Sequence, residues 1–271
     1  MSNDHATLIL DHVYQHEAAQ PDRVFLTQPV GGGEVVDFTW AQTLDQARRM
    51  AAHLQSLGLP PGARIAMLAK NSAHFFMAEL AIWMAGGTTV AIFPTETADN
   101  VGYVLRHCEA SLLFIGKLDT WDLQKGGIPA GLPCVALPLA PAALADLPGC
   151  ESWDAITART PPLPGRPQRA AGDLAMLLYT SGSTGQPKGV MQTFGSITAA
   201  AGMVARGVAA NGGVRIGFSN ALFLPDGTPN TAELGRNAAP EALEPAFGCR
   251  PKSVGRGRPG RKASFLASPT G

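Results

Sequence analysis

The sequence contains little cysteine, and the cysteines it has do not cluster. They are Cys108, Cys134, Cys150 and Cys249. No two of them form a Cys-x-x-Cys pair and no group of histidines stands near them, whereas zinc sites and the disulfide frameworks of small secreted proteins need such groupings. We therefore assign no metal-ligating residue, and the dispersed thiols favour a cytoplasmic protein, where conditions are reducing.

The sequence also lacks an uninterrupted hydrophobic run of membrane-spanning length. Its most apolar stretch runs from Phe75 to Phe93, but Glu79 lies within it and Gly86-Gly87 divides it. A buried helix followed by a buried strand fits this pattern, so we expect no transmembrane segment. The first residues, Met-Ser-Asn-Asp-His, lack the positive and apolar regions of a secretion signal.

A surplus of charge of one sign is absent as well. The formal net charge is zero, with 45% hydrophobic and 15% charged residues. The composition can bury a sizeable core, and nothing in the overall charge indicates a nucleic-acid partner. The two parts of the chain differ in net charge, however. Residues 1–210 hold 13 Lys/Arg against 17 Asp/Glu, and residues 211–271 hold 8 Lys/Arg against 4 Asp/Glu.

What the sequence does contain, up to about residue 210, is an alternation of strand and helix patterns. We expect helices over residues 5–18, 43–58, 73–85, 98–108, 152–158 (capped by Ser152) and 196–208, and strands over 24–28, 34–39, 64–69, 88–93, 112–115 and 134–137. A Gly31-Gly32-Gly33 turn is expected to join the first two strands. Strands alternating with helices imply parallel strands joined by crossover helices, which is an α/β fold. The four prolines of residues 160–169 indicate a connecting loop before the next strand.

The most informative stretch is Tyr179 to Val190, which reads Tyr-Thr-Ser-Gly-Ser-Thr-Gly-Gln-Pro-Lys-Gly-Val. The apolar residues 175–179 before it indicate a short buried strand. Glycine permits close backbone approach to a ligand, successive N–H groups can bind an anion, and hydroxyl groups add donors. Lys188 supplies a mobile positive charge suited to phosphate. These features together favour a nucleoside triphosphate as ligand.

This stretch differs from the common phosphate loop, in which lysine directly follows glycine and begins a helix. Here Gln186-Pro187 separates Gly185 from Lys188, and proline favours extended geometry in the residue before it. We therefore expect Lys188 to begin another strand, giving a strand–loop–strand. The alternative of an ordinary Ser/Gly surface turn does not require this order of residues.

Over these twelve positions the chain resembles the signature loop of the adenylate-forming (AMP-binding) superfamily. Further resemblance runs through most of residues 8–208, at Pro21-Asp22-Arg23-Val24, Phe38-Thr39-Trp40, 62–67 with Asn71, and 86–90. The Phe-Gly at 194–195 is similar to a bacterial acyl-CoA synthetase subgroup, so long-chain fatty acyl-CoA synthetases are the nearest match. The fold implied is the amino-terminal part of the large adenylate-forming domain, a mostly parallel sheet with flanking helices, without the small carboxy-terminal domain.

The resemblance implies a two-step acid–thiol ligation. A carboxylate attacks the α-phosphate of ATP to give an acyl-adenylate, and the thiol of coenzyme A then displaces AMP. The residues implied in ATP phosphate binding are Thr180, Ser181, Gly182, Ser183, Thr184, Gly185 and Lys188. The expected small-molecule partners are a carboxylic acid, ATP and CoA, with Mg²⁺ as the family's cofactor; no nucleic-acid partner is expected.

Several elements that the family carries after this loop are missing from the sequence. No tyrosine follows Tyr179, which excludes the Tyr-Gly-x-Thr-Glu segment that contacts adenine and magnesium, and no Thr-Gly-Asp occurs. No histidine follows His107. We assign no catalytic residue, the Mg²⁺ carboxylate ligand is absent, and we expect little or no ligase activity from this chain alone. The sequence resembles an amino-terminal fragment of such an enzyme.

Residues 211–271 differ in character from residues 1–210. They contain ten glycines, seven prolines and no sustained periodicity, and six basic residues fall within thirteen positions at 250–262. Three interpretations remain open: an anion-binding tail, a disordered end with too little apolar surface to fold, and a shifted reading frame beginning near Asn211. The abrupt end of the resemblance favours the last.

Other groupings have simpler explanations than a functional site. His5, His12 and His16 fall on one helical face, but no acid or cysteine completes a metal site, so an exposed polar face is expected. We expect Glu79 and Glu96 to be solvated. The tryptophans are isolated and should pack in the core or against loops.

The acid that the family reaction would activate is left open by the sequence. Subgroup resemblance favours a medium- or long-chain fatty acid. A carrier-protein-loading adenylation domain and a catalytically silent product are the alternatives.

Overall fold

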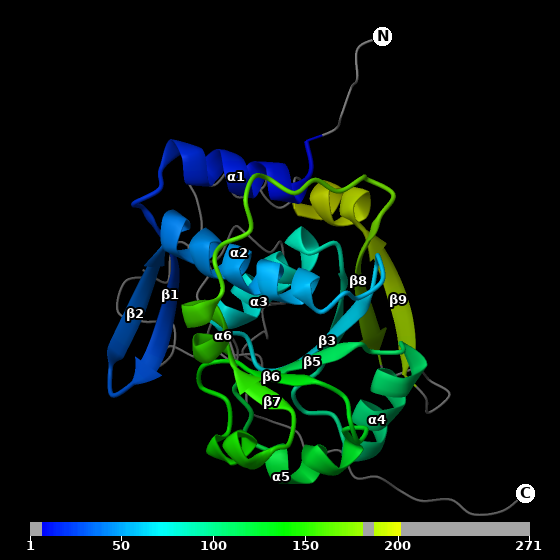
Figure 1. The fold of residues 1–271 in the computed structure, drawn as a ribbon. Helices are drawn as coiled ribbons and strands as arrows, with labels where there is room; N and C mark the ends of the chain where they lie inside the picture. The colour runs from blue at the N-terminus through cyan, green and yellow to red at the C-terminus, as the bar shows by residue number, and fades with distance from the viewer. Residues whose placement is uncertain (1–6, 181–186, 202–271) are drawn as a thin grey trace, which may run out of the picture.

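The computed structural model describes residues 7–180 and 187–201. At its centre is a seven-stranded sheet with the order β7-β6-β5-β3-β4-β8-β9 (Figure 1). Its strands are β3 (Arg64–Leu68), β4 (Thr88–Ile92), β5 (Leu112–Ile115), β6 (Cys134–Ala136), β7 (Cys150–Ser152), β8 (Leu174–Thr180) and β9 (Lys188–Thr193). Neighbouring strands are parallel except β8 and β9, which are antiparallel. The predicted α/β fold with a mostly parallel sheet is confirmed.

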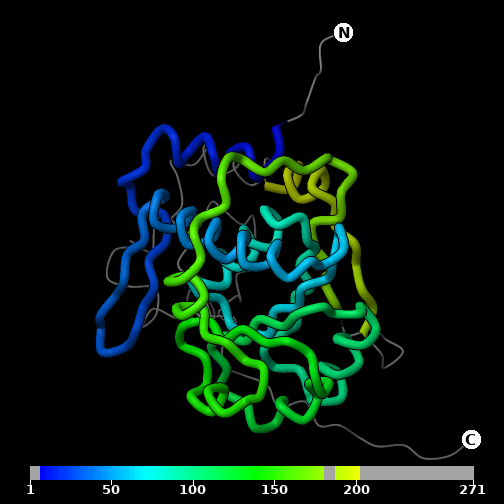
Figure 2. The backbone as a smooth tube through the Cα atoms, in the orientation of Figure 1, coloured from blue at the N-terminus to red at the C-terminus, as the bar shows by residue number. Residues whose placement is uncertain are grey.

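Helices cover both faces of this sheet (Figures 1 and 2). One face carries α2 (Trp40–Ser56), α3 (Ala73–Met84) and α6 (Trp153–Arg159), with α1 (Ile9–Ala19) packed outside α2. The other face carries α4 (Ala98–His107), α5 (Trp121–Gln124) and the 3-10 turns η1 (Lys125–Gly127) and η2 (Ala142–Asp146).

Side-chain alternation along the strands separates the two hydrophobic clusters. In β3, Ile65 and Met67 belong to the cluster under α2 and α3, whereas Ala66 and Leu68 belong to the cluster under α4. Buried parallel strands have this pattern because successive side chains point to opposite faces and helices cover both.

A separate hairpin of β1 (Val24–Gly31) and β2 (Glu34–Thr39) stands beside this core. Its turn is the predicted Gly31-Gly32-Gly33, and all three glycines have positive φ angles, of 103°, 62° and 85°. A side chain is strained at such angles, so the glycines determine where the chain reverses. Strand β1 continues three residues beyond the predicted 24–28.

Capping residues set the helix boundaries. The helix expected over 43–58 begins earlier, at Trp40, because Thr39 and Gln42 form a capping box. The Gln42 N–H donates to Thr39 Oγ1 at 3.2 Å, and the Thr39 N–H donates to Gln42 Oε1 at 2.9 Å. The predicted cap Ser152 is confirmed, since its Oγ accepts from the Ala155 N–H at 3.2 Å.

Some short elements were not predicted, namely β7, α5 and the two 3-10 turns. Each has three to five residues, too few to show a period in the sequence. The helix expected over 5–18 runs from Ile9 to Ala19, and residues 1–6 lie outside the described part. The helix expected from Ser196 begins at Phe194 and is described to residue 201; its continuation and residues 211–271 lie outside.

The expectation that Glu79 is solvated was wrong. Ten of the twelve residues of α3 are buried, and Glu79 is 9% exposed. Its Oε1 has no hydrogen-bond partner within residues 7–180 and 187–201. Helix α3 lies between the sheet, α2 and β1, so even its charged position is covered. Burial raises the pKa of the Glu79 carboxyl to about 7.

The other side-chain expectations can be compared with the structure. All four tryptophans are buried, as expected. His12 and His16 lie on the exposed face of α1, and His5 is outside the described residues. The described ranges hold no group of three or more His, Cys, Asp or Glu side chains that could ligate a metal ion. None of the helices in these ranges combines the length and hydrophobicity needed to cross a bilayer.

Candidate functional site

The β8–β9 hairpin carries the stretch that the sequence singles out. Thr180 at the end of β8 is the register partner of Lys188 at the start of β9, so these two residues close the connecting loop. The predicted strand–loop–strand is confirmed by these two strands. Lys188 is exposed and has no acidic partner among the described residues. The remaining predicted phosphate-binding residues, Ser181, Gly182, Ser183, Thr184 and Gly185, lie outside the described part of the chain.

A buried tyrosine anchors the closed end of this hairpin. The Tyr179 hydroxyl is hydrogen-bonded to His107 Nδ1 of α4 at 2.7 Å, and the His107 ring stacks on Tyr103 with centroids 5.2 Å apart. Burial raises the pKa of the Tyr179 hydroxyl to about 12, so the hydroxyl keeps its proton at neutral pH and can donate it to His107.

The tyrosine ring also determines which residue can follow Lys188. A Cβ atom placed on Gly189, the register partner of Tyr179, would lie 3.2 Å from Tyr179 Cζ. Any larger residue would therefore require the ring or the strand to shift by a few tenths of an ångström. Gly189 keeps β9 close to β8 where the loop closes.

The loop end of the hairpin lies at the edge of the sheet that the carboxyl ends of the parallel strands form. Open α/β folds bind their ligands at this edge. After β3 the chain enters α3 on one face, and after β4 it enters α4 on the other face. This divergence opens a crevice between the carboxyl ends of β3 and β4. The structure has a cavity of about 130 Å³ there.

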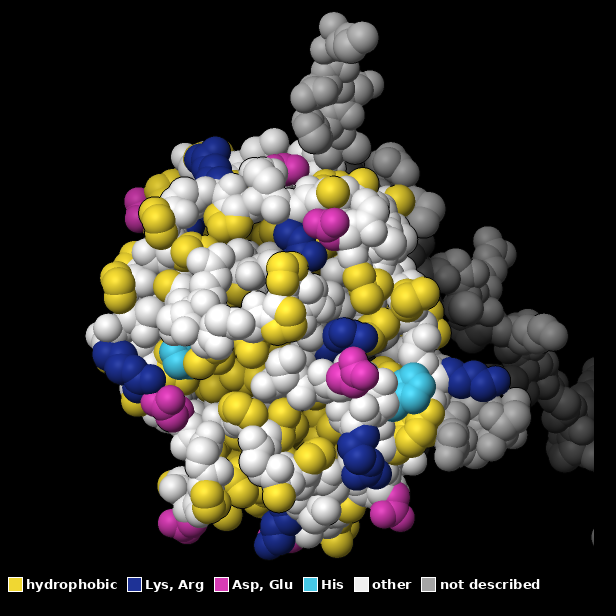
Figure 3. Space-filling view, turned by 45° about the vertical axis from the view of Figure 1, so that its right-hand side comes forward, with side chains coloured by type: hydrophobic (Ala, Val, Ile, Leu, Met, Phe, Trp, Pro, Cys, Tyr) yellow, Lys and Arg dark blue, Asp and Glu magenta, His cyan; other side chains and the backbone are white. Residues whose placement is uncertain are grey.

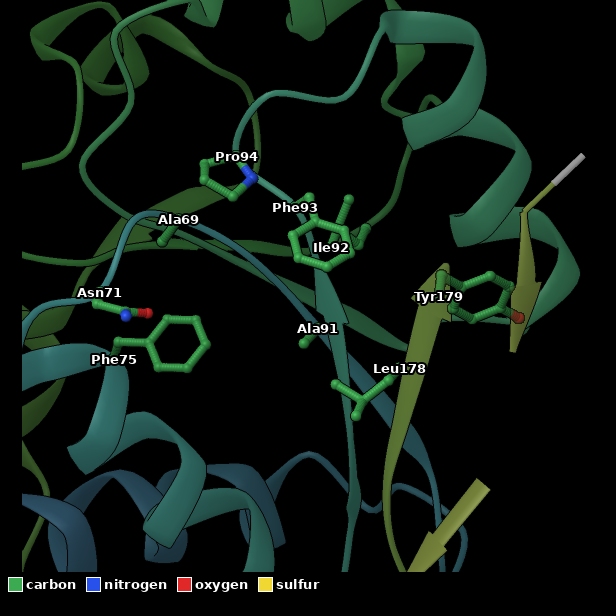
Figure 4. Close-up of a pocket in the computed structure, with 9 residues that line it drawn as sticks. All are labelled: Ala69, Asn71, Phe75, Ala91, Ile92, Phe93, Pro94, Leu178 and Tyr179. Atoms are coloured by element: carbon green, nitrogen blue, oxygen red, sulfur yellow. The ribbon is translucent and has the colours of Figure 1, made fainter. Parts of the chain in front are cut away.

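The cavity is mainly apolar, and Figure 4 shows how its walls are arranged. Phe75 of α3 and Leu178 of β8 point toward one another across it, and Asn71 contributes an amide at its rim. Tyr179 borders it and directs its ring to the opposite side, toward β9 (Figure 4). The cavity therefore shares β8 with the hairpin, so an apolar group and an anion could be bound by adjoining parts of one sheet edge.

A second lysine at this edge is already neutralised. Lys70, which follows β3, forms an ion pair with Asp119, which follows β5. Nearby, Glu96 Oε2 accepts from Asn100 Nδ2 at 2.7 Å and is held at the start of α4. Lys188 is consequently the cation of the hairpin that can pair with an incoming anion.

The contact between His107 and Tyr179 was not predicted from the sequence, because the two residues are 72 positions apart and no local pattern links them. The cavity was not predicted either, because its walls come from three separate stretches of the chain, 69–75, 91–94 and 178–179. The local sequence near the cavity, Gly86-Gly87 and the apolar residues after them, predicts strand β4 but carries no sign of the crevice beside it.

Comparison with known proteins identifies the family. Residues 13–219 match the family of AMP-binding enzymes. The chain belongs to this family. A long-chain-fatty-acid–CoA ligase of Mycobacterium bovis, FadD15, is 32% identical over 187 residues, covering 67% of this chain and 30% of the ligase. A linear gramicidin synthase of Brevibacillus parabrevis is 28% identical over 193 residues, covering 68% of this chain and 3% of that protein.

Two solved structures share the fold. A benzoate CoA ligase from Burkholderia xenovorans LB400 has a TM-score of 0.60 and 19% identity, covering 74% of this chain and 37% of the ligase chain. The anthranilate CoA ligase AuaEII has a TM-score of 0.59 and 21% identity, covering 69% and 35%. The chain thus spans about a third of these ligases and 30% of the Mycobacterium relative.

The surface beside the hairpin carries mixed charge. In Figure 3, Lys and Arg side chains are interspersed with Asp and Glu on the face that is turned to the viewer. The described residues of this face therefore produce no large electrostatic field of one sign that would attract a charged ligand. An anion that bound there would have to be held by groups close to it.

Proposed function

We propose that this chain supplies the part of an AMP-forming acyl-CoA synthetase that holds the phosphates of ATP. The observation that carries the proposal is the β8–β9 hairpin, with Thr180 and Lys188 as register partners at the ligand-binding edge of the sheet. Membership of the AMP-binding family supports a nucleotide as the ligand. By the division we propose, residues 1–210 belong to the adenylate-forming domain and residues 211–271 form a separate tail.

In the proposed reaction a carboxylate oxygen attacks the α-phosphorus of ATP, pyrophosphate leaves, and an acyl-adenylate forms. The thiol of CoA then attacks the acyl carbon and AMP leaves. Two anions must meet in the first step, so holding and neutralising the phosphates is the main task of the protein. We assign that task to Lys188 together with the hydroxyls of Thr180, Ser181, Ser183 and Thr184 and the backbone N–H groups between them.

Magnesium would shield the phosphates in such an enzyme. The described residues contain no cluster of carboxylates that fits the ion, and the family segment that supplies its ligand is missing from the sequence. We assign to this chain the binding and orientation of ATP.

For the acid we propose a medium- or long-chain fatty acid, with the protein acting in the cytoplasm. The 32% identity to a long-chain-fatty-acid–CoA ligase supports this choice. The match to a linear gramicidin synthase supports the second candidate, an adenylation domain that loads a carrier protein. Pyrophosphate exchange with fatty and amino acids separates the two, and exchange with neither acid class indicates a catalytically silent product.

The proposal is tested by comparing nucleotides on the full chain. Calorimetric titration should give tighter binding of ATP than of AMP, because the hairpin is assigned to the β- and γ-phosphates, which AMP lacks. Equal affinities for ATP and AMP would place the contacts elsewhere. If neither ATP nor AMP bound, the result would contradict the proposed function.

A further inference from the structure

Two of the three described cysteines lie side by side at the far end of the sheet from the hairpin. Cys134 of β6 and Cys150 of β7 are register partners in parallel strands. Register partners in a parallel pair point to the same face, and both residues pack into the hydrophobic cluster under α4. Strands in a sheet lie about 4.8 Å apart, which falls within the Cα separation of about 4.4–6.8 Å that a disulfide needs.

The electrostatics of the two thiols agree with this proximity. Burial raises the pKa of the Cys134 thiol to about 12, and the Cys150 thiol is the second cause. Burial also raises the pKa of the Cys150 thiol, against the effect of the Ala136 backbone N–H on the neighbouring strand β6. Both residues are free thiols in the structure.

Access to the pair is one-sided. Cys150 is half-buried and lines a pocket of about 220 Å³ between the ends of β6 and β7 and the segment that joins them. Cys134 is 3% exposed and its thiol donates to the Leu132 carbonyl at 3.3 Å. A reagent in solution can therefore reach Cys150 and has no direct path to Cys134.

We propose that Cys134 and Cys150 form a dithiol–disulfide site whose reaction partner is a low-molecular-weight disulfide. The Cys150 thiol loses its proton and attacks one sulfur of the small disulfide, whose S–S bond breaks and releases one small thiol. The Cys134 thiol then loses its proton and attacks the Cys150 sulfur, which releases the second small thiol. Two protein thiols are oxidised and one small disulfide is reduced to two thiols.

The bond would fasten the edge of the sheet. Strand β7 is the outermost strand on its side and has only three residues. A covalent link to β6 would hold it in register, and reducing conditions would release it.

The test uses the full chain carrying Cys249→Ser, which leaves the three described cysteines. The chain is incubated with glutathione disulfide, alkylated, and cut without reduction by a protease that cleaves before aspartate. This cleavage places Cys108, Cys134 and Cys150 on separate peptides, 99–118, 122–145 and 146–153. The expected result is a linked pair of peptides 122–145 and 146–153 with Cys108 still alkylated.

Single variants test the order of events. Cys134→Ser should stop at a glutathione adduct on Cys150, and Cys150→Ser should leave Cys134 unmodified in the folded chain. Cys108→Ser, another buried thiol, is the matched control and should form the linked pair as the parent does. Slower deuterium uptake in peptide 146–153 after oxidation would support the tightening of β7.

The proposal is overturned if peptides 122–145 and 146–153 remain unlinked at every glutathione disulfide concentration, whether or not Cys150 carries glutathione. It is also overturned if, in the folded chain, peptide 99–118 with Cys108 is linked as often as peptide 146–153 with Cys150, because the sheet register would then not select the pair. The peptide map of the parent chain does not depend on whether either serine variant folds.

Discussion

The hydrogen bond between Tyr179 and His107 gives a quantitative prediction about the hairpin. Tyr179→Phe removes the hydroxyl but keeps the ring against Gly189, and it leaves His107 Nδ1 without its 2.7 Å partner. A neutral hydrogen bond contributes about 0.5–1.5 kcal/mol net to stability. We expect the free energy of unfolding to fall by about 1 kcal/mol, which for a domain of this size lowers Tm by about 2–4 °C.

A double-mutant cycle isolates this bond from other effects. His107→Phe keeps a ring to stack on Tyr103 and removes the same bond from the other side. The double variant should cost less than the sum of the two single variants, by about 1 kcal/mol, because neither partner is then left unpaired. Unfolding in urea followed by tryptophan fluorescence measures all four proteins.

Tyr103→Phe is the matched control for this cycle, since the Tyr103 hydroxyl makes no hydrogen bond to the described residues while its ring stacks on His107. It should leave the urea midpoint nearly unchanged. The Tyr179–His107 bond does not stabilise the chain if Tyr179→Phe has no larger effect than Tyr103→Phe, or if the two single variants of the cycle are additive within about 0.3 kcal/mol.

Three further predictions concern buried titratable groups and the sheet edge. The pKa of Glu79 is raised to about 7 in the folded chain, so the folded state holds the proton more tightly than the unfolded state does. The free energy of unfolding should therefore fall as pH rises from about 4.5 to 7. Glu79→Gln should remove this component, which would be measured as a smaller difference in urea midpoint between pH 5 and pH 8. Burial lowers the pKa of His74 to about 4, so its contribution should be complete above pH 6.5 and decline toward pH 4, and His74→Gln should abolish that acid sensitivity. Met191 is 71% exposed on the outermost strand β9. Met191→Lys should reduce light scattering of concentrated protein, since a charge on an edge strand opposes edge-to-edge pairing. Unchanged scattering would exclude β9 as the aggregating edge.

The parts of the fold that local patterns specify were predictable from the sequence. The glycine turn at 31–33, the strand over Leu112–Ile115 and the cap at Ser152 depend on neighbouring residues and were placed correctly. The three-residue strand β7 was not predictable, because it exists only through pairing with β6. Glu79 was misjudged for a similar reason, since its burial depends on what α2 and β1 place over α3.

The candidate site divides in the same way. The Tyr179 to Val190 stretch specified a strand–loop–strand through the order of its glycines, proline and lysine, and β8 and β9 have that arrangement. The contacts that position it come from α4, 72 residues earlier. The cavity beside it results from helices leaving opposite faces of the sheet, which only the strand order reveals.

An ATP titration of the full chain and of two lysine variants shows whether the β8–β9 hairpin holds the phosphates. Lys188→Ala should weaken ATP binding by about 10- to 150-fold, because a charge-assisted hydrogen bond contributes about 1.5–3 kcal/mol. Lys125→Ala removes an equally positive, exposed side chain that is paired with Asp122 away from the hairpin, and it should bind ATP as the parent does. If both variants bind ATP with the parent's affinity, the β8–β9 hairpin does not hold the phosphates.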